Sequence, residues 1–585
     1  MRILFFYLLT NIIVMSTFSQ SSLITPFEKN ENQTTTYQEC IAYYLMLASQ
    51  FKEIKCTPFL DTDSGFPLHE VVISMDAFTP DEVRKQGKTI LFLNNGIHPG
   101  EPEGIDASMM LARDLVTKPE LRKLLEKTTI VLIPVYNIDG CLNRNSFTRT
   151  NQNGPESYGF RGNDRNLDLN RDFIKCDTRN AKSFNALFTK WMPDVMIDNH
   201  TSNGADYQYV MTLITSQEDK LGPAMAQYVK KELNPALFKG MNDKGWDMVP
   251  YVNADGPPDE DGIEQFLDLP RFSSGYAALH HCIAFMPETH MLKAFPPRVR
   301  STYDMMLVML EYLENNGKKV QKIKQESIEW YKHQQSIPLN WAIDKTQFDT
   351  IPFKGFEAGH KKSEVTGHDR LYYDRDKPYT KTIPYYNSYK SSLEVTKPFA
   401  YIISQAYDNV VDRLIRNKVH VERLASETTM KVQVYRIKDF KSSATAYEGH
   451  FLHNHTSVET FNMDKVFRKG DYIVYCDQEA IRYVVETLEP EAPDSYFNWN
   501  FFDGILGQKE YFSDYVFEDL AAQYLKDNPA IKAELEKKKA DDEAFRKSPE
   551  AILDWVYHHS PWYEVTHKMY PVARLMDPTD LPTIR

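Results

Sequence analysis

A histidine and a glutamate lie three residues apart in the stretch IHPGEPEG, where His98 and Glu101 follow an apolar run at 89–97. Pro99 and Gly100 lie between them and favour a tight turn, which can direct both side chains at one ion. Imidazole and carboxylate are ligands that suit Zn²⁺. Because the motif is short and arises often by chance, a capped helix start beside a surface histidine is the competing interpretation.

A second histidine follows another apolar run. His200, in DNHTSNG, is separated from the apolar run at 194–197 only by Asp198 and Asn199. A catalytic zinc site has three protein ligands and keeps one position for water, so His200 supplies the ligand that the first turn lacks. Asp198 is a candidate hydrogen-bond acceptor for a ligand histidine, although its two-residue spacing from His200 leaves this open. The alternative is a histidine packed at a strand end.

A glutamate also stands beside an apolar run, because Glu288 follows residues 282–286 in IAFMPETHMLK. A carboxylate at the edge of a buried strand is costly unless it is paired or takes part in catalysis. Next to a metal-bound water, such a group can take a proton and pass it to a leaving amine. We therefore expect Glu288 to be a general base. His290 shares the strand face, but we do not expect it to be a ligand because three are already available.

The stretch 147–173, FTRTNQNGPESYGFRGNDRNLDLNRDF, contains several arginines. An arginine can bind a terminal carboxylate through two parallel hydrogen bonds, and a second arginine near a metal can stabilise an oxyanion. Arg149 and the pair Asn170 and Arg171 are the candidates for these tasks. The alternative is a solvated surface loop, and it is strongest for Arg161.

Short apolar strands are expected to position these residues, because such runs alternate with helical stretches along the chain. Near-continuous apolar strands between helices indicate a largely parallel or mixed sheet that is covered on both faces. Sheets of this kind bind ligands beyond the carboxyl ends of their strands. The expected strands are 89–97, 129–135, 194–197 and 282–286.

In its motifs the chain resembles the zinc metallocarboxypeptidases, peptidase family M14. The likeness rests on HPGE, YNIDG, DLNR, DNH and a strand-borne glutamate, in the family's order, and covers about residues 60–310. It implies an α/β fold with a mixed, mostly parallel eight-stranded sheet between helices. It also implies one Zn²⁺ ion and hydrolysis of C-terminal peptide bonds.

The resemblance assigns a role to each matching residue. It implies His98, Glu101 and His200 as zinc ligands, Glu288 as general base and then acid, Arg149 as the group that polarises the carbonyl, and Asn170 with Arg171 as the clamp for a C-terminal carboxylate. Arg161 rivals Arg149, because the loop before DLNR is long. Tyr276, in RFSSGYAAL, is the candidate for the family's mobile tyrosine, although its spacing from Glu288 is short.

With 585 residues the chain is expected to contain two or three domains. Arg2 and an apolar run up to about residue 18 predict a signal peptide rather than a membrane anchor, because Asn11 interrupts a run shorter than the roughly 20 residues of a span. The part after residue 396 resembles accessory regions of larger secreted bacterial members, and a mixed or β-sandwich-like module is expected. The predicted boundaries are 1–19 for the signal peptide, 20–60 for an N-terminal segment, 61–335 for the catalytic domain, 336–396 for a linker and 397–585 for the accessory domain.

Composition restricts the possible partners. The chain is 42% apolar and 25% charged with a net charge of -13, which is typical of a folded protein and argues against nucleic acid or anionic lipid as the main partner. A peptide or peptide-like substrate is compatible with this charge. The six cysteines lie far apart without a CxxC pair. Disulfides between Cys40 and Cys56 or between Cys141 and Cys176 are as compatible with the sequence as buried free thiols.

The sequence therefore predicts an exported zinc metallocarboxypeptidase, periplasmic or extracellular. Two alternatives remain. A zinc amidase or deacylase would use the same metal chemistry on acylated amino acids or cell-wall peptides, and a non-catalytic binding protein would retain only the fold. The preferred side chain of the substrate and the oligomeric state are left open.

Overall fold

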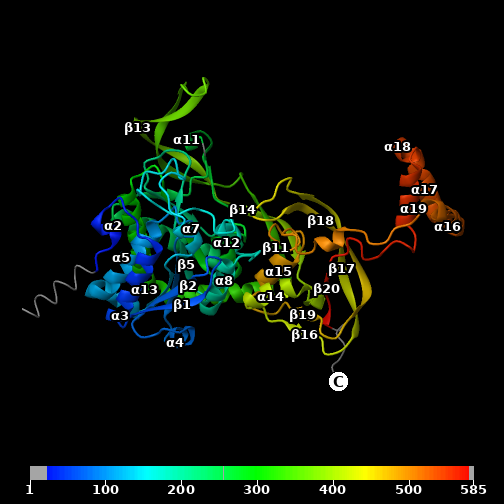
Figure 1. The fold of residues 1–585 in the computed structure, drawn as a ribbon, viewed down its shortest axis with the longest axis horizontal. Helices are drawn as coiled ribbons and strands as arrows, with labels where there is room; N and C mark the ends of the chain where they lie inside the picture. The colour runs from blue at the N-terminus through cyan, green and yellow to red at the C-terminus, as the bar shows by residue number, and fades with distance from the viewer. Residues whose placement is uncertain (1–22, 255, 579–585) are drawn as a thin grey trace, which may run out of the picture.

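The computed structural model describes residues 23–254 and 256–578, so the predicted signal peptide at 1–19 lies outside the described residues. Within the described ranges, no helix has both the length and the apolar character of a membrane span. We refer to residues 23–335 as the N-terminal half and to residues 336–578 as the C-terminal half. The ribbon shows the N-terminal half built around one sheet, with the β-rich C-terminal half beside it (Figure 1).

The sheet of the N-terminal half has the strand order β1-β2-β4-β3-β5-β10-β7-β8, and β6 pairs with β10. It is parallel along β4, β3, β5 and β10, and antiparallel at β1, β2 and β7. Only Asn199 separates β5 from β6, and both strands pair with β10, so together they occupy one position. The sheet therefore has eight strand positions and is mixed, as predicted. The strands are β1(Ile54–Asp61), β2(Pro67–Ile73), β3(Thr89–Asn94), β4(Thr128–Ile133), β5(Val195–Asp198), β6(His200–Ser202), β7(Met211–Thr215), β8(Met248–Pro250) and β10(Ile283–His290).

The central strands are buried on both faces. In β3, Leu91 and Leu93 belong to the apolar core on one side of the sheet, while Ile90 and Phe92 belong to the core on the other side. This follows from the alternation of side chains along a strand. It explains why these strands are apolar without interruption.

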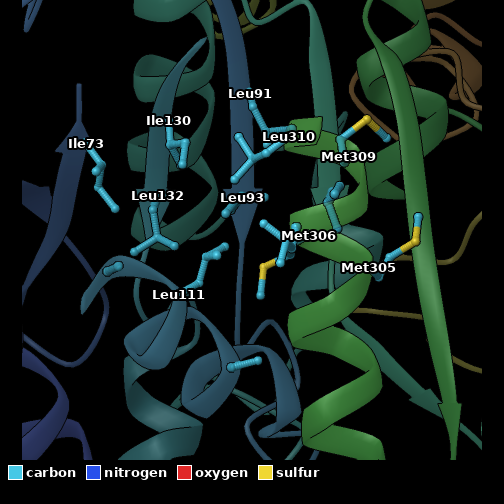
Figure 2. Packing of buried hydrophobic residues seen from close by; sticks show 14 of the residues in the cluster. Ile73, Leu91, Leu93, Leu111, Ile130, Leu132, Met305, Met306, Met309 and Leu310 are labelled. Atoms are coloured by element: carbon cyan, nitrogen blue, oxygen red, sulfur yellow. The ribbon is translucent and has the colours of Figure 1, made fainter. Parts of the chain in front are cut away.

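One face is covered by the helices α3(Tyr37–Gln50), α5(Glu103–Thr117) and α13(Phe295–His333). Figure 2 shows side chains of β2, β3 and β4 packed against Leu111 of α5 and against Met305, Met306, Met309 and Leu310 of α13. Each fully buried aliphatic side chain of this size contributes about 1.5–3 kcal/mol to folding. The core therefore holds the strand ends rigidly.

The other face is covered by helices from both halves. α8(Arg179–Trp191) and α12(Ser273–Leu279) pack there together with α14(Asp408–Arg416) and α15(Ile481–Leu488) of the C-terminal half. Their buried side chains form one continuous apolar cluster. The C-terminal half is therefore fused to the N-terminal half through a shared core.

The C-terminal half contains an antiparallel sheet of order β16-β19-β15-β20-β17-β18. The sequence left two forms open for this half, a mixed module and a β-sandwich-like module. The structure has the mixed form, because α14 and α15 pack on one face of the sheet. Its strands are β15(Ala400–Ile403), β16(Glu422–Arg423), β17(Thr428–Ser442), β18(His453–Phe467), β19(Tyr472–Tyr475) and β20(Val572–Leu575).

The segment 336–396, which we expected to be a linker, is built of strands. β11(Ser336–Ile343) pairs with β14(Tyr389–Thr396), and between them β12(Asp349–Lys362) and β13(Asp369–Tyr386) form a long hairpin. The base of this hairpin is tied to the N-terminal half, because β13 pairs with β9(Ile263–Glu264). Its tip extends away from the body (Figure 1).

The remaining elements lie outside the two sheets. α16(Asp514–Asp527), α17(Pro529–Asp541), α18(Glu543–Arg546) and α19(Pro549–His558) form a separate helical cluster (Figure 1) with its own small core. The other helices are α2(Pro26–Lys29), α4(Pro80–Lys85), α6(Pro119–Arg122), α7(Ile138–Leu142), α9(Pro223–Tyr228), α10(Asn234–Asp243) and α11(Pro258–Asp261). All six cysteines are free, so the structure contains neither of the disulfides considered above.

Candidate metal centre and active site

The predicted ligands and base gather at the carboxyl ends of adjacent strands. His98 follows β3, His200 begins β6, and Glu288 lies in β10. β3 pairs with β5, β5 pairs with β10, and in the parallel pairing of β6 with β10 the residue opposite His200 is Glu288. Parallel strand order thus brings residues that are far apart in sequence to one edge of the sheet.

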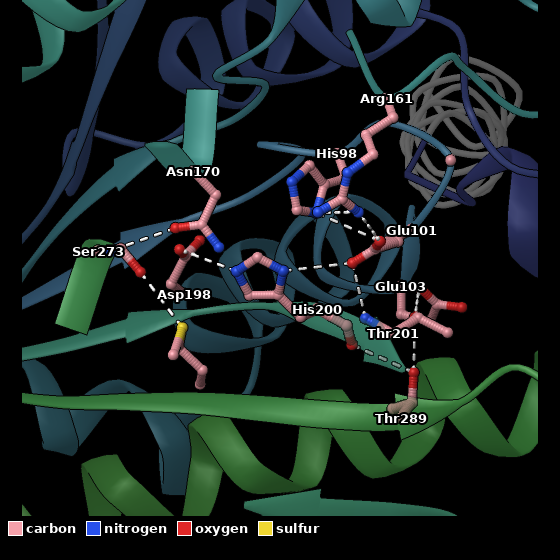
Figure 3. Close-up of polar contacts among 12 residues, drawn as sticks. His98, Glu101, Glu103, Arg161, Asn170, Asp198, His200, Thr201, Ser273 and Thr289 are labelled. Carbon is pink, nitrogen blue, oxygen red and sulfur yellow. Dashed lines mark hydrogen bonds and ion pairs between the residues drawn. The ribbon is translucent and has the colours of Figure 1, made fainter. Parts of the chain in front are cut away.

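Three of these side chains form a compact cluster (Figure 3). One ligand atom from each of His98, Glu101 and His200 lies within 4.8 Å of the others. Nδ1 of His98 is 3.2 Å from Glu101 Oε1, and Nδ1 of His200 is 3.2 Å from Glu101 Oε2. All three residues are buried. Two imidazole nitrogens and a carboxylate converging on one point are the donor set of a catalytic zinc site, so the residues fit this metal.

The turn from His98 to Glu101 has the tight form expected from its sequence. The backbone N–H of Glu101 donates to the carbonyl of His98 at 2.8 Å. At Gly100 a Cβ atom would lie 2.6 Å from Cδ of Arg149 and 3.0 Å from the carbonyl oxygen of Gly159. Glycine is therefore needed at this position so that the turn and the arginine loop can approach each other.

A carboxylate holds the far nitrogen of each histidine. Nε2 of His98 donates to Asp168 Oδ1 at 2.9 Å, and Nε2 of His200 donates to Asp198 Oδ2 at 3.0 Å. These bonds leave both Nδ1 atoms directed at Glu101 and fix the ring orientations. Asp198 occupies the place considered for it from the sequence. The role of Asp168 was missed, although it stands in the DLNR motif.

The charges of the cluster shift its pKa values strongly. Burial opposes the charged form of His200, but the charge of Asp198 and the hydrogen bond to it raise the pKa of His200 well above its usual value. Burial also opposes ionisation of Asp168, but His98 and Arg161 hold the pKa of Asp168 well below its usual value. The site is therefore a concentrated set of opposite charges, as expected where a cation binds.

Both candidate arginines reach this cluster. Arg149 donates to Glu101 Oε1 at 3.0 Å and to the carbonyl of Thr201 at 3.3 Å. Arg161 lies 2.9 Å from Asp168 Oδ2 and 3.4 Å from Glu101 Oε1. Arg161 is therefore bound to the cluster although 45% of its side-chain surface is exposed, so the solvated loop that the sequence favoured for it describes only part of its surroundings.

The cluster forms one wall of a pocket of about 350 Å³. Glu288 lines this pocket, and burial raises its pKa to about 8 although the neighbouring His200 opposes the shift. Asn170 and Arg171 line it as well. The remaining lining residues are Arg149, Arg161, Thr201, Ser202, Asn203, Ile214, Tyr251, Phe266, Phe272, Met286 and Met291.

Arg171 and Asn170 are held in place by their neighbours. The guanidinium of Arg171 lies 4.5 Å above the ring of Phe272, and it donates to the carbonyl of Asn170 at 2.7 Å. The Asn170 side-chain oxygen accepts from the N–H of Ser273 at 3.1 Å (Figure 3). A cationic fork at the pocket wall is suited to bind a carboxylate.

The prediction for Tyr276 is wrong. Tyr276 lies fully buried in α12, its ring packs against Phe173 and Phe188, and its hydroxyl donates to Asn417 at 2.6 Å. The apolar pattern of RFSSGYAAL reflects a core helix rather than a mobile segment. The tyrosine that lines the pocket is Tyr251, which follows β8 and carries no sequence signal that distinguishes it from other tyrosines.

This fold and this cluster define a metal-dependent hydrolase, and comparisons with known proteins agree. Residues 47–213 match the family described as zinc carboxypeptidase, a range that contains every predicted zinc ligand. Carboxypeptidase 2 of Trichophyton tonsurans is 23% identical over 426 residues, covering 70% of this chain and 73% of the relative. Probable carboxypeptidase 2 of Arthroderma benhamiae is 22% identical over 428 residues, covering 70% of this chain and 74% of the relative.

Among solved structures, a metallo-carboxypeptidase from Burkholderia cenocepacia is 14% identical, with a TM-score of 0.36, over 48% of this chain and 69% of that one. A metallo-carboxypeptidase from Pseudomonas aeruginosa is also 14% identical, with a TM-score of 0.36, over 48% of this chain and 68% of that one. The family match confirms the resemblance seen in the motifs. Residues 47–213 match a zinc carboxypeptidase domain, and this match together with the carboxypeptidase relatives indicates a zinc metallopeptidase of the carboxypeptidase type.

Proposed function

We propose that the protein is an exported carboxypeptidase that removes the C-terminal residue of peptides, using one zinc ion. The observation that carries this proposal is that Asn170 and Arg171 line the same pocket as the His98, Glu101 and His200 cluster. A carboxylate clamp beside a metal centre selects the end of a chain rather than an internal peptide bond.

His98 and His200 through Nδ1, and Glu101 through its carboxylate, would hold the zinc ion. When bound, zinc lowers the pKa of a water molecule towards neutrality and polarises the scissile carbonyl. Asp168 and Asp198 keep each imidazole in the tautomer that offers Nδ1 to the metal. Both carboxylates therefore belong to the proposed centre.

Glu288 is the proposed general base. It lies across from His200 in the β6 and β10 pairing and lines the pocket. Its raised pKa of about 8 makes its carboxylate a stronger proton acceptor than an ordinary glutamate and, once protonated, a donor suited to neutral pH. It would take a proton from the attacking water and deliver it to the leaving amine.

Arg149 or Arg161 would stabilise the negative charge that develops on the carbonyl oxygen. Both guanidinium groups contact Glu101 and line the pocket. An Arg149→Lys and an Arg161→Lys variant separate them. The residue that acts on the transition state is the one whose change lowers kcat and leaves KM nearly unaltered.

The side chain of the C-terminal residue has room in a second cavity. This cavity of about 270 Å³ shares Ile214, Tyr251 and Phe266 with the pocket and lies beyond them. Its wall is mainly apolar and includes the buried Glu218. We propose that it receives the side chain that follows the scissile bond.

The test compares peptides with a free C-terminal carboxylate against their amidated forms and against N-acylated amino acids. Release of single C-terminal residues from free-carboxylate peptides by the zinc-loaded protein supports a carboxypeptidase. Turnover of only the amidated or acylated compounds would favour the amidase or deacylase. If zinc content is the same in wild type and in a His200→Ala variant, the metal centre itself is wrong and a binding protein with this fold remains.

Export is part of the proposal because of residues 1–19. Expression of the full chain with a reporter fused at its C-terminus, followed by fractionation and N-terminal sequencing, tests it. A mature N-terminus near residue 20 in the exported fraction is the expected result, and a cytoplasmic protein that begins at Met1 contradicts it.

A further inference from the structure

A tight turn of the C-terminal half lies against the loop that carries the carboxylate clamp. In the connection between β17 and β18, the backbones of Tyr447 and His450 exchange two hydrogen bonds of 2.7 and 3.0 Å. Between them Glu448 has φ of 50° and Gly449 has φ of 84°. Two successive positive φ angles are the geometry of a two-residue hairpin turn, which projects its side chains in a fixed direction.

Three side chains of this turn bind the loop 168–177 of the N-terminal half. Nε of Arg171 donates to the Tyr447 hydroxyl at 3.0 Å. The backbone N–H of Asp168 donates to Glu448 Oε2 at 2.7 Å. Nε2 of His450 donates to Asp177 Oδ2 at 2.7 Å.

The turn is itself held from behind. The Tyr447 ring stacks on Trp499, with ring centroids 6.2 Å apart and an interplanar angle of 22°. Trp499 is fully buried, and its indole N–H donates to Asp494 at 3.1 Å. Tyr447 therefore contacts Arg171 from a rigid support.

We propose that this turn belongs to the substrate-binding machinery, with Tyr447 as a positioning residue for Arg171 and Glu448 as a positioning residue for Asp168. Neither residue lines the pocket, so both act through the residues that do. The inference deepens the proposed carboxypeptidase function and rests on it. It also assigns a purpose to the C-terminal half, which would complete the clamp of the N-terminal half.

The chemistry of the Tyr447 contact suits this purpose. A phenol accepts the Nε–H of Arg171 without neutralising the guanidinium, so the positive charge stays available for a substrate carboxylate. The nearest carboxylate of the same loop, Asp168, lies farther away at 3.9 Å. A bond to Nε also fixes the plane of the fork, which a two-point contact with a carboxylate requires.

Glu448 has a separate effect that leads to the metal. Its bond to the N–H of Asp168 fixes the start of the short turn at 168–171, whose first residue orients His98. Loss of this bond would loosen both the clamp and one zinc ligand. We therefore expect substitutions of Tyr447 and of Glu448 to cause two different measurable losses.

The first experiment uses Tyr447→Phe in the full-length zinc enzyme, which removes one hydroxyl and keeps the stacked ring. For a free-carboxylate peptide, KM is expected to rise about 10- to 150-fold, the range for one hydrogen bond to a charged group, while kcat changes less than about twofold. Tyr511→Phe is the matched control, because Tyr511 is 75% exposed and donates only to the carbonyl of Gln508. A Tyr447→Phe enzyme with the KM of the control overturns the role of Tyr447.

A double-mutant cycle separates this inference from the proposed function. If Arg171→Ala leaves KM for free-carboxylate peptides unchanged, the clamp and with it the carboxypeptidase proposal fail. If Arg171→Ala raises KM and Tyr447→Phe does not, only the inference fails. With both correct, Tyr447→Phe adds nothing to Arg171→Ala, whereas additive losses show that Tyr447 acts elsewhere and overturn its role.

The second experiment compares Glu448→Ala with Glu448→Gln, with the melting temperature of each variant measured to confirm folding. Gln keeps an oxygen that accepts the Asp168 N–H, so it should retain zinc affinity and KM near the wild-type values. Ala should lower zinc affinity severalfold and raise KM. Equal zinc affinity and KM in the Ala and Gln variants overturn the role of Glu448.

Discussion

Replacing Glu288 by Gln tests the proposed base and the physics of its environment together. The change keeps the size of the side chain and removes its capacity to accept a proton. General acid–base catalysis contributes about 10²- to 10⁴-fold to rate, so we expect kcat to fall by a factor in this range. KM and zinc content should change by less than about threefold, because Glu288 is not among the clustered ligands.

The same substitution should stabilise the metal-free protein. Burial raises the pKa of Glu288 from 4.5 to about 8 in the folded state. Because the folded pKa is the higher one, the ionised group opposes folding, and stability is lost as pH rises above about 4.5. Each pKa unit corresponds to about 1.4 kcal/mol, so at pH 7 the cost is on the order of 3 kcal/mol. Gln does not have this cost.

The assay has two parts. Kinetics with peptides that have a free C-terminal carboxylate, together with metal analysis, test the base. Thermal unfolding of chelator-treated protein between about pH 4 and 8 tests the stability. The wild-type and Glu288→Gln proteins should have equal stability near pH 4 and diverge as pH rises, with the variant the more stable. Glu534→Gln, at an exposed position of α17, is the control. A Glu288→Gln enzyme with more than about a third of wild-type kcat, or a variant less stable than wild type at pH 7, refutes the reasoning.

Three further predictions follow from single contacts. Asp168→Asn should weaken zinc binding by about 10- to 100-fold in chelator competition, because it alters the partner that orients His98; unchanged affinity contradicts this. Glu218 accepts hydrogen bonds from Gln265 and Asn234 in the second cavity, and among the described residues it has no ion-pair partner. We therefore expect substrates ending in Lys or Arg to be preferred over substrates ending in Leu. The Glu218→Gln variant should reduce that preference at least about tenfold. Equal kcat/KM for Lys and Leu peptides in wild type would rule this out. Leu414→Ala, in the core shared by both halves, should cost about 2–5 kcal/mol and still leave one calorimetric transition, whereas two separated transitions would show that the halves unfold independently.

The motifs were sufficient to predict the class of enzyme because those that carry the ligands and the base lie at or near the carboxyl end of an apolar strand. A buried strand cannot shift register without moving its apolar residues out of the core, so a polar residue just beyond it has a fixed place. His98 follows β3 and His200 follows β5 in this way, while Glu288 lies near the end of β10. The order of the motifs along the chain then indicated the family, which the family match confirms.

The positions of residues that depend on contacts with other segments could not be predicted from the sequence. Tyr276 was assigned to the pocket by motif and lies in the core, while Tyr251 lines the pocket without any motif. Arg161 lies in a loop that looks solvated, and its contacts with Asp168 and Glu101 exist only because that loop folds back over the cluster. A loop residue has no periodic pattern from which its direction can be predicted.

The sequence alone determined the donor set, the strands that carry it and the class of chemistry, because ligand types and apolar runs are local properties. Only the tertiary structure decided what completes the site. The contact between Tyr447 and Arg171 joins residues 276 positions apart, and that between Glu448 and Asp168 joins residues 280 positions apart. Nothing local in either segment encodes such a contact, since it depends on the shared core that fixes the C-terminal half against the N-terminal half.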